Sequence, residues 1–294
     1  MKGLINLYKP PGISSHTAVL HIRKILGQKK IGHSGTLDPG ASGVLVLGVN
    51  QGTRVLEFLL AADKQYRAEI TFGIKTDSGD SYGKVVEKSS VRVKPQDLEV
   101  VLKQFLGESK QLPPMTSAIK VHGKKLYELA RKGQTIERPE RQIKIHKIEL
   151  VSFYHTSFGP KAVVDVKCSK GTYIRTLCED IAEKLGTIAY MSFLVRTHLG
   201  NYSIFSAYSI DEIQNLFYRS KNNYLLPIKC ICDGNRFLKY VVEEKDVKKV
   251  INGVSIPVKD YYTGQEIALF SPDGELLALG LKIEEQIKVK KVLV

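Results

Sequence analysis

The segment IGHSGTLDPGASGVLVLG, residues 31–48, joins a glycine-rich turn directly to a run of aliphatic residues. The aliphatic run is typical of a strand that is buried on both faces. The glycines, and the proline that follows Asp38, allow tight backbone turns that other residues resist. We therefore predict that Asp38 lies at the mouth of a rigid, buried element. An aspartate before a proline is often only a turn former, so a purely structural role stays open on this pattern alone.

The length and charge of the chain limit the classes of protein it can belong to. It has 294 residues, enough for a large domain and a small one, and a formal net charge of +14 at pH 7. Such a charge favours a polyanionic partner, either a nucleic acid or an anionic membrane surface. The sequence has no apolar run of about 18 residues and no signal-peptide apolar region, so we predict a cytoplasmic protein that does not bind membranes.

The sequence lacks the signatures of several common chemistries. Its four cysteines are spaced as C-x9-C and C-x-C, which fits neither a zinc site nor a disulfide framework. It contains no P-loop, no G-x-S-x-G and no H-E-x-x-H motif. We predict no metal site.

Hydrophobic periodicity and turn residues outline an α+β fold with a largely antiparallel sheet. Helical patterns with plausible caps occupy residues 14–27, 94–107, 172–186 and 209–220, and alternating strand patterns occupy residues 64–74, 83–93, 143–154 and 161–171. After residue 233 strand patterns alternate with turns, including a Pro-Asp-Gly hairpin signal at 272–274. We predict a catalytic domain over residues 1–232 and a small β-rich domain over residues 233–294.

Residues 111–141 differ in character from their surroundings. The segment is basic, carries two prolines before a helical pattern, and ends in a second charged, proline-containing stretch. An inserted element that faces RNA would have this composition, and so would an ordinary solvated helical hairpin.

Two short clusters, DKQYRAE at 63–69 and KGTYIRTL at 170–177, each combine a tyrosine with arginine or lysine. Stacking on bases and contact with phosphates require this combination, although each cluster alone is more often a half-buried strand or helix end. Together with the glycine-framed Asp38, they favour an RNA-directed function.

These motifs, in this order, resemble the bacterial tRNA pseudouridine-55 synthase family of the TruB type across essentially the whole chain. The matching segments are LYKPPGISSH (7–16), GHSGTLDPGASGVL (32–45), DKQYRAEITFGIKTDSGD (63–80), QLPPMTSAIKVHGKKLYELARKG (111–133), CSKGTYIRTLCEDI (168–181) and FLVRTHLG (193–200). The resemblance makes residues 111–141 the family's thumb insertion and residues 233–294 a domain similar to the RNA-binding PUA domain. Two positions depart from the family pattern: Thr116 stands where an aromatic residue is common, and Gly40 where a bulkier residue is common.

The resemblance implies isomerisation of uridine to pseudouridine at position 55 in the T loop of tRNA, without cofactor or metal. Asp38 would be the catalytic carboxylate, acting either as nucleophile or as base toward a glycal. Arg175 would hold Asp38 ionised through a bidentate bond, and Tyr66 would stack on the uracil and help to remove the C5 proton. The expected substrate contacts are Leu194 on the apolar side of the pocket, Tyr173, His33 as a wedge that replaces the flipped base, and Lys9, Lys120, Lys124, Arg131 and Lys170 at phosphates.

Three alternatives stay open at this point. His33 could be a turn residue that is satisfied locally. The protein could be a tRNA-folding chaperone whose catalysis is secondary, or a guide-RNA-dependent synthase subunit. We expect a monomer that acts on the T arm of tRNA with no obligatory protein partner.

Overall fold

The computed structural model describes residues 1–90, 92–117, 120–121, 124–126, 129, 134, 136–233, 236–259 and 261–294. Within these residues nine strands form one sheet, and β1, β3, β12, β4, β11, β10 and β7 follow one another across it. Their bounds are β1 Gly3–Lys9, β3 Ser42–Val49, β4 Lys64–Phe72, β7 Gly107–Gln111, β10 Arg141–Thr156, β11 Gly159–Cys168 and β12 Ala189–Leu199. β2 (Ile31–His33) pairs with β3, and β13 (Tyr202–Ser203) pairs with β12.

The sheet is antiparallel except where β3 and β12 run in parallel, which confirms the predicted α+β fold with a mainly antiparallel sheet. All eight residues of β3 are buried, as its continuous apolar sequence predicts. This strand carries the turn that holds Asp38.

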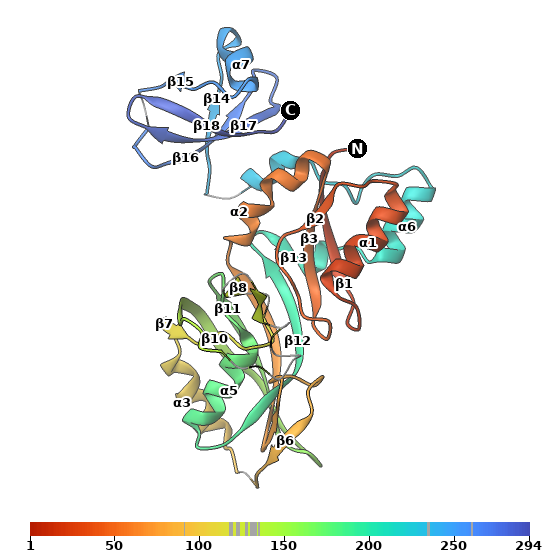
Figure 1. The fold of residues 1–294 in the computed structure, drawn as a ribbon, viewed down its shortest axis with the longest axis vertical. Helices are drawn as coiled ribbons and strands as arrows, with labels where there is room; N and C mark the ends of the chain where they lie inside the picture. Colours follow the sequence, from red (N-terminus) through yellow and green to blue (C-terminus); the bar gives the residue numbers. More distant parts are fainter. Residues whose placement is uncertain are drawn as a thin grey trace.

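Helices cover the sheet in two groups (Figure 1). α3 (Pro95–Gln104) and α5 (Ile174–Lys184) pack over β10, β12 and β4, whereas α1 (Ser15–Leu26) and α6 (Ile210–Tyr218) lie at the β1 end. α1 begins after Ser14, whose side chain accepts a hydrogen bond from the Thr17 amide, and ends at Gly27 in the left-handed conformation. α6 begins with a capping box between Ser209 and Glu212. The predicted helices of these regions are therefore confirmed.

Two strand predictions need correction. β12 was not predicted as a strand, because a bulge at Ser192 interrupts the alternation of its side chains. The predicted strand over 83–93 is reduced to β6 (Val85–Lys88), which pairs with β5 (Ile74–Thr76). All four residues of β6 are exposed, so its alternation does not report a buried face.

The segment 111–141 contains β8 (Lys120–Val121) and β9 (Lys124–Lys125), which pair with one another. The helix predicted from KKLYELARKG falls mainly outside the described residues.

Short helical segments pack between the large sheet and the C-terminal region. They are η1 (Asn50–Val55), α2 (Leu56–Leu60), η2 (Ile204–Ser206) and η3 (Ile228–Cys232). The C-terminal region has its own sheet in the order β14, β16, β17, β18, β15, with bounds Leu238–Val241, Glu266–Phe270, Leu276–Ile283, Gln286–Val292 and Ile256–Pro257, and one helix, α7 (Glu244–Ile251). The Pro-Asp-Gly turn joins β16 to β17 as predicted.

The C-terminal sheet packs against α2, above the large sheet in Figure 1. Arg236 donates to the Phe58 carbonyl at 3.0 Å, lies over the Phe58 ring, and forms an ion pair with Glu266 at 2.7 Å. No helix within the described ranges is long and apolar enough to cross a membrane.

Asp180 on α5 supplies a test of the packing. Burial raises the pKa of Asp180 to about 6, and repulsion from Glu179 and Glu183 adds to this. The pKa of Asp180 is higher in the folded than in the unfolded protein. The stability that this group contributes is therefore fully present below pH 3.8, and it is lost as the pH rises through 6. We expect Asp180→Asn to raise the free energy of unfolding by about 1 kcal/mol at pH 7, after allowance for partial exposure, and to leave it unchanged near pH 3.5. Chemical denaturation at both pH values measures this, and an equal effect at both would contradict the assignment.

Candidate active site

The turn that carries Asp38 is fastened from several sides. The Ser15 hydroxyl bonds both to the Leu37 amide, at 2.8 Å, and to the Leu37 carbonyl, at 3.0 Å. The Pro39 carbonyl accepts hydrogen bonds from the Gly12 amide at 2.9 Å and from Lys9 Nζ at 3.3 Å. These bonds fix the backbone on both sides of Asp38, as a preorganised catalytic group requires.

Close packing of β3 on β12 explains the glycine at position 43. Gly43 has φ +104°, and a Cβ atom there would lie 2.2 Å from the Arg196 carbonyl oxygen. Arg196 in turn donates from Nε to the Val44 carbonyl at 2.7 Å and from Nη2 to the Gly35 carbonyl at 3.3 Å. One side chain of β12 thus holds both ends of the Asp38 turn.

Arg175 meets Asp38 across the cavity, with Arg175 Nε 3.1 Å from Asp38 Oδ2. The predicted bidentate bond is absent, because the two Nη atoms are used elsewhere. Nη1 donates to the Ser78 carbonyl at 3.0 Å and to the Thr116 hydroxyl, and Nη2 donates to the Thr116 carbonyl at 3.0 Å. The two Nη atoms therefore anchor the Arg175 guanidinium, and Nε is the atom that faces the Asp38 carboxylate.

The electrostatic environment of Asp38 combines opposing effects. Burial raises the pKa of Asp38, the Arg175 charge lowers it, and the nearby Asp80 carboxylate raises it again. The net shift is upward, so Arg175 offsets only part of the cost of keeping this carboxylate ionised. Asp80 Oδ2 lies 3.8 Å from Arg175 Nε, so one arginine serves two carboxylates.

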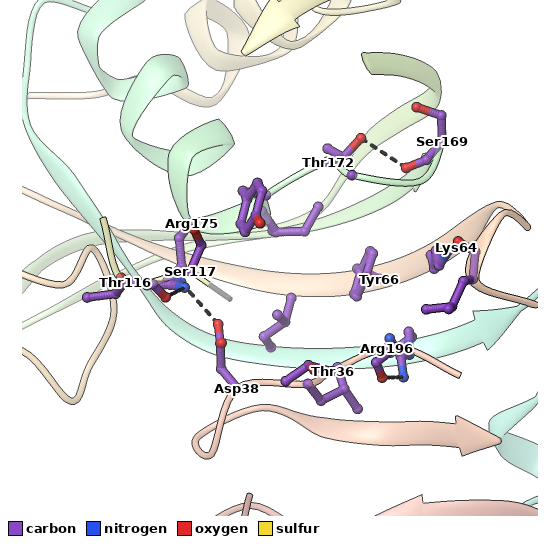
Figure 2. Close-up of a pocket in the computed structure, with 17 residues that line it drawn as sticks. Thr36, Asp38, Lys64, Tyr66, Thr116, Ser117, Ser169, Thr172, Arg175 and Arg196 are labelled. Atoms are coloured by element: carbon purple, nitrogen blue, oxygen red, sulfur yellow. Dashed lines mark hydrogen bonds and ion pairs between the residues drawn. The ribbon is translucent and has the colours of Figure 1, made fainter. Parts of the chain in front are cut away.

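A cavity of about 320 Å³ opens beside Asp38 (Figure 2). Five predicted site residues line it: Asp38, Tyr66, Tyr173, Arg175 and Leu194. They come from the Asp38 turn, from β4, from the segment at the start of α5, and from β12. Asp38 is the one acidic side chain among the described residues that line the cavity.

Tyr66 lies between Asp38 and Lys64 in Figure 2. Burial raises the pKa of the Tyr66 phenol, and the charge of the neighbouring Arg196 offsets part of this shift. The raised pKa keeps the hydroxyl protonated at neutral pH, and the ring is available for stacking. Stacking on the uracil and removal of the C5 proton by Tyr66 stay predictions.

Lys9 does not face solvent as a phosphate contact should. Its side chain is completely buried, and Nζ donates to the carbonyls of Pro10, Ile13 and Pro39. Burial lowers the pKa of Lys9 to about 8. The prediction that Lys9 contacts a phosphate is therefore wrong, because its ammonium group already donates to three backbone carbonyls.

Among the described residues, His33 and Lys170 do not line the main cavity. His33 is half-buried on β2, burial lowers its pKa, and its Nδ1 atom has no hydrogen-bond partner among the described residues. Lys170 lines an adjoining cavity of about 480 Å³ together with Arg141, Gln142, Leu60 and Gly171. Lys120 and Lys124 begin the short strands β8 and β9. Arg131 lies outside the described residues.

The lining residues that were not predicted as site residues include Lys64, Thr116 and Arg196. A signal existed for Arg196, because a charged residue that follows the apolar residues FLV needs a partner if the strand is buried. Thr116 was noted only as a departure from the family, whereas in the structure it anchors Arg175. Among the described residues no group of three histidine, cysteine, aspartate or glutamate side chains could hold a metal ion.

Comparison with known proteins identifies the family of the chain. Residues 23–174 match the family described as TruB family pseudouridylate synthase (N terminal domain), and residues 175–230 match the tRNA pseudouridylate synthase B C-terminal domain. The chain is 44% identical to the tRNA pseudouridine synthase B of Pelotomaculum thermopropionicum, over 95% of this chain and 90% of that protein. It is 40% identical to the Bacillus subtilis protein of the same name, over 95% and 92% of the two chains.

Solved structures show the same fold. A chain of a Cbf5-Nop10-Gar1 complex is similar with a TM-score of 0.78 and 28% identity, covering 99% of this chain and 85% of that chain. A chain of an H/ACA RNP bound to a substrate RNA containing 2′-deoxyuridine gives a TM-score of 0.77 and 26% identity over the same shares. The ranges matched by the two family models include Asp38, Tyr66 and Arg175. The chain belongs to the TruB family of pseudouridylate synthases.

Proposed function

We propose that this protein isomerises uridine to pseudouridine in tRNA, at position 55 of the T loop. The observation that carries the proposal is a single carboxylate, Asp38, held by Arg175 at the wall of a cavity that Tyr66 also lines. The names of the related proteins support tRNA as the substrate. The position within tRNA rests on the family resemblance.

The geometry suits a reaction that moves a glycosidic bond without hydrolysing it. Hydrolytic glycosidases use two carboxylates, one of which acts on the leaving oxygen and one on water or the sugar carbon. Here one carboxylate lines the cavity, and the apolar Leu194 and Leu60 close part of it. Exclusion of water keeps the detached uracil from being lost to hydrolysis.

Asp38 would act first, at the sugar. With the uracil on the Tyr66 ring, the carboxylate either attacks C1′ or removes a proton to form a glycal, and both routes break the N1 bond. After rotation, C5 bonds to the same carbon. The net change exchanges an N1–C1′ bond for a C5–C1′ bond and a C5–H bond for an N1–H bond, so no co-reactant is required.

The target uridine must leave the stack of the T loop before it can enter the cavity, at a cost of a few kcal/mol. We propose that His33 fills the vacated space, because it lies on β2, next to the turn that carries Asp38. Residues 111–141 would grip the T arm. The protein would act in the cytoplasm as a monomer without a protein partner.

Two other functions have weaker support. A tRNA-folding chaperone needs RNA-binding surfaces only, and it would not require the anchored Arg175 beside Asp38. A guide-dependent subunit is suggested by the similarity to chains of Cbf5 and H/ACA complexes, but the sequence identity to the tRNA enzymes is higher.

Release of tritium from tRNA transcribed with [5-³H]uridine tests the proposal, because the C5 hydrogen is replaced in the reaction. The isolated protein, with EDTA present, should release one equivalent of tritium per tRNA. Tight tRNA binding without release would support the chaperone, and release only on addition of guide RNA and partner proteins would support the guide-dependent subunit.

Binding of tRNA should weaken steeply with salt, because the net charge of +14 implies contacts with several phosphates. Lys170, at the cavity rim, is expected to contribute one of them. In a titration of Kd against KCl concentration, Lys170→Gln should reduce the logarithmic slope by about 1. Lys103→Gln, at an exposed position in the last turn of α3, removes the same charge outside the predicted contacts and serves as control. Equal slopes for the two variants would remove Lys170 from the interface.

A further inference from the structure

Two buried cations, Lys64 and Arg196, lie at the end of the main cavity away from Asp38 (Figure 2). Lys64 is 8% exposed and Arg196 is 1% exposed. Among the described residues, no carboxylate lies within ion-pair distance of either group: Asp63, next to Lys64 in the chain, pairs with His146 instead. Buried charges are normally paired, so this end of the cavity carries positive charge that no carboxylate of the described residues neutralises.

Backbone carbonyls hold the two cations in place but leave some of their hydrogens uncommitted. Lys64 Nζ donates to the Leu60 carbonyl at 2.7 Å and to the Ala62 carbonyl at 2.6 Å, which uses two of its three hydrogens. Arg196 donates from Nε to the Val44 carbonyl and from Nη2 to the Gly35 carbonyl, which uses two of its five hydrogens. Both groups are therefore fixed in position and retain donors for a ligand.

The two cations also affect one another. Burial lowers the pKa of Lys64 to about 8, and repulsion from Arg196 adds to this shift, whereas Asp63 and Cys168 oppose it. An anion between the cations would relieve this repulsion. The positive end also adjoins the second cavity, where Leu60 and Gly171 are shared and where Arg141 and Lys170 line the rim. Basic groups thus extend from the surface into the site.

We propose that Lys64 and Arg196 form a phosphate subsite, which binds one of the two phosphodiester groups that flank the target uridine. The inference rests on the proposed function and deepens it. With the uracil on Tyr66 and the sugar at Asp38, a phosphate in this subsite would pull the flipped nucleotide toward the opposite end of the cavity. Carboxylate and cations would then fix the sugar from two sides.

The test neutralises the phosphate instead of the protein. Three tRNAs are prepared with a single methylphosphonate: on the 5′ side of the target uridine, on its 3′ side, and in the acceptor stem as control. For the wild type, one of the flanking substitutions should lower kcat/KM by about tenfold or more, as the loss of charge-assisted hydrogen bonds predicts. The acceptor-stem substitution should have no comparable effect.

Lys64→Gln supplies the second arm of a double-mutant cycle. On unmodified tRNA, the kcat/KM of this variant should fall by about the same factor as the kcat/KM of the wild type falls on the sensitive methylphosphonate tRNA. When the variant acts on that methylphosphonate tRNA, kcat/KM should be little lower than with either change alone. Lys103→Gln on α3 controls for net charge. If the two fold-losses in kcat/KM multiplied instead, Lys64 would act at the uracil or have a purely structural role. That result would overturn the subsite.

If Lys64→Gln fails to fold, the experiment with the wild-type protein still tests the subsite, because the methylphosphonate changes the RNA and not the protein. Turnover that is equal on all three methylphosphonate tRNAs would overturn the subsite and leave the proposed function intact. Absence of turnover on unmodified tRNA would instead overturn the proposed function.

Discussion

Replacing Asp38 by asparagine should lower kcat by about 10⁴-fold or more while changing the Kd for tRNA by less than about threefold. The amide keeps the size of the side chain and can still accept a hydrogen bond from Arg175 Nε, now 3.1 Å from the carboxylate. It has no charge with which to attack C1′ or remove a proton. Single-turnover kinetics and filter binding measure the two quantities separately.

Asp165→Asn is the matched control. Asp165 pairs with Arg67 at 2.7 Å on the exposed face of the sheet, away from the cavity. Its loss should change stability by less than about 1 kcal/mol and leave turnover unchanged. If Asp38→Asn lost tRNA affinity and turnover to the same extent, Asp38 would be a binding residue and the catalytic assignment would be wrong.

The second large effect is expected at Arg175, whose removal should act through the ionisation of Asp38. The Arg175 charge lowers a carboxyl pKa that burial and Asp80 raise. Arg175→Gln should therefore raise the pKa of Asp38 further, move the acidic limb of the pH–rate profile to higher pH, and lower kcat at pH 7 by about 10²-fold or more.

Pre-steady-state rates from pH 5 to 9 test this expectation, and Arg175→Lys tells charge from anchoring. A lysine restores a positive charge but cannot hold Ser78, Thr116 and Asp38 at once, so it should restore the position of the limb more than it restores kcat. An acidic limb that stays in place in Arg175→Gln would show that Arg175 orients Asp38 without tuning its charge.

Much of the architecture is predictable from local sequence. β3 is continuously apolar because both of its faces are buried, and α1 carries its own start at Ser14 and stop at Gly27. β12 is not predicted from the sequence, because a bulge interrupts the alternation of its side chains. The local sequence pattern indicates which face of an element is buried, and this prediction fails where the register of the strand shifts.

The site was predictable only in part, for a different reason. Asp38, Tyr66 and Arg175 lie in motifs whose order carries a family resemblance. The fastening contacts join residues that are distant in sequence, such as Lys9 with Pro39, Ser15 with Leu37, and Arg196 with Val44. Lys9 looked like an exposed cation beside two prolines, and its burial follows from carbonyls that only the folded chain brings together.

We expect the isolated protein to isomerise one uridine of tRNA, at position 55. The most direct measurement maps pseudouridine by carbodiimide modification and primer extension in an unmodified tRNA transcript, and in the same transcript with cytidine at position 55. Stoichiometric conversion at position 55, and none anywhere in the cytidine transcript, is the predicted result. Conversion at another position, or none in a tRNA that the protein binds tightly, would contradict the account.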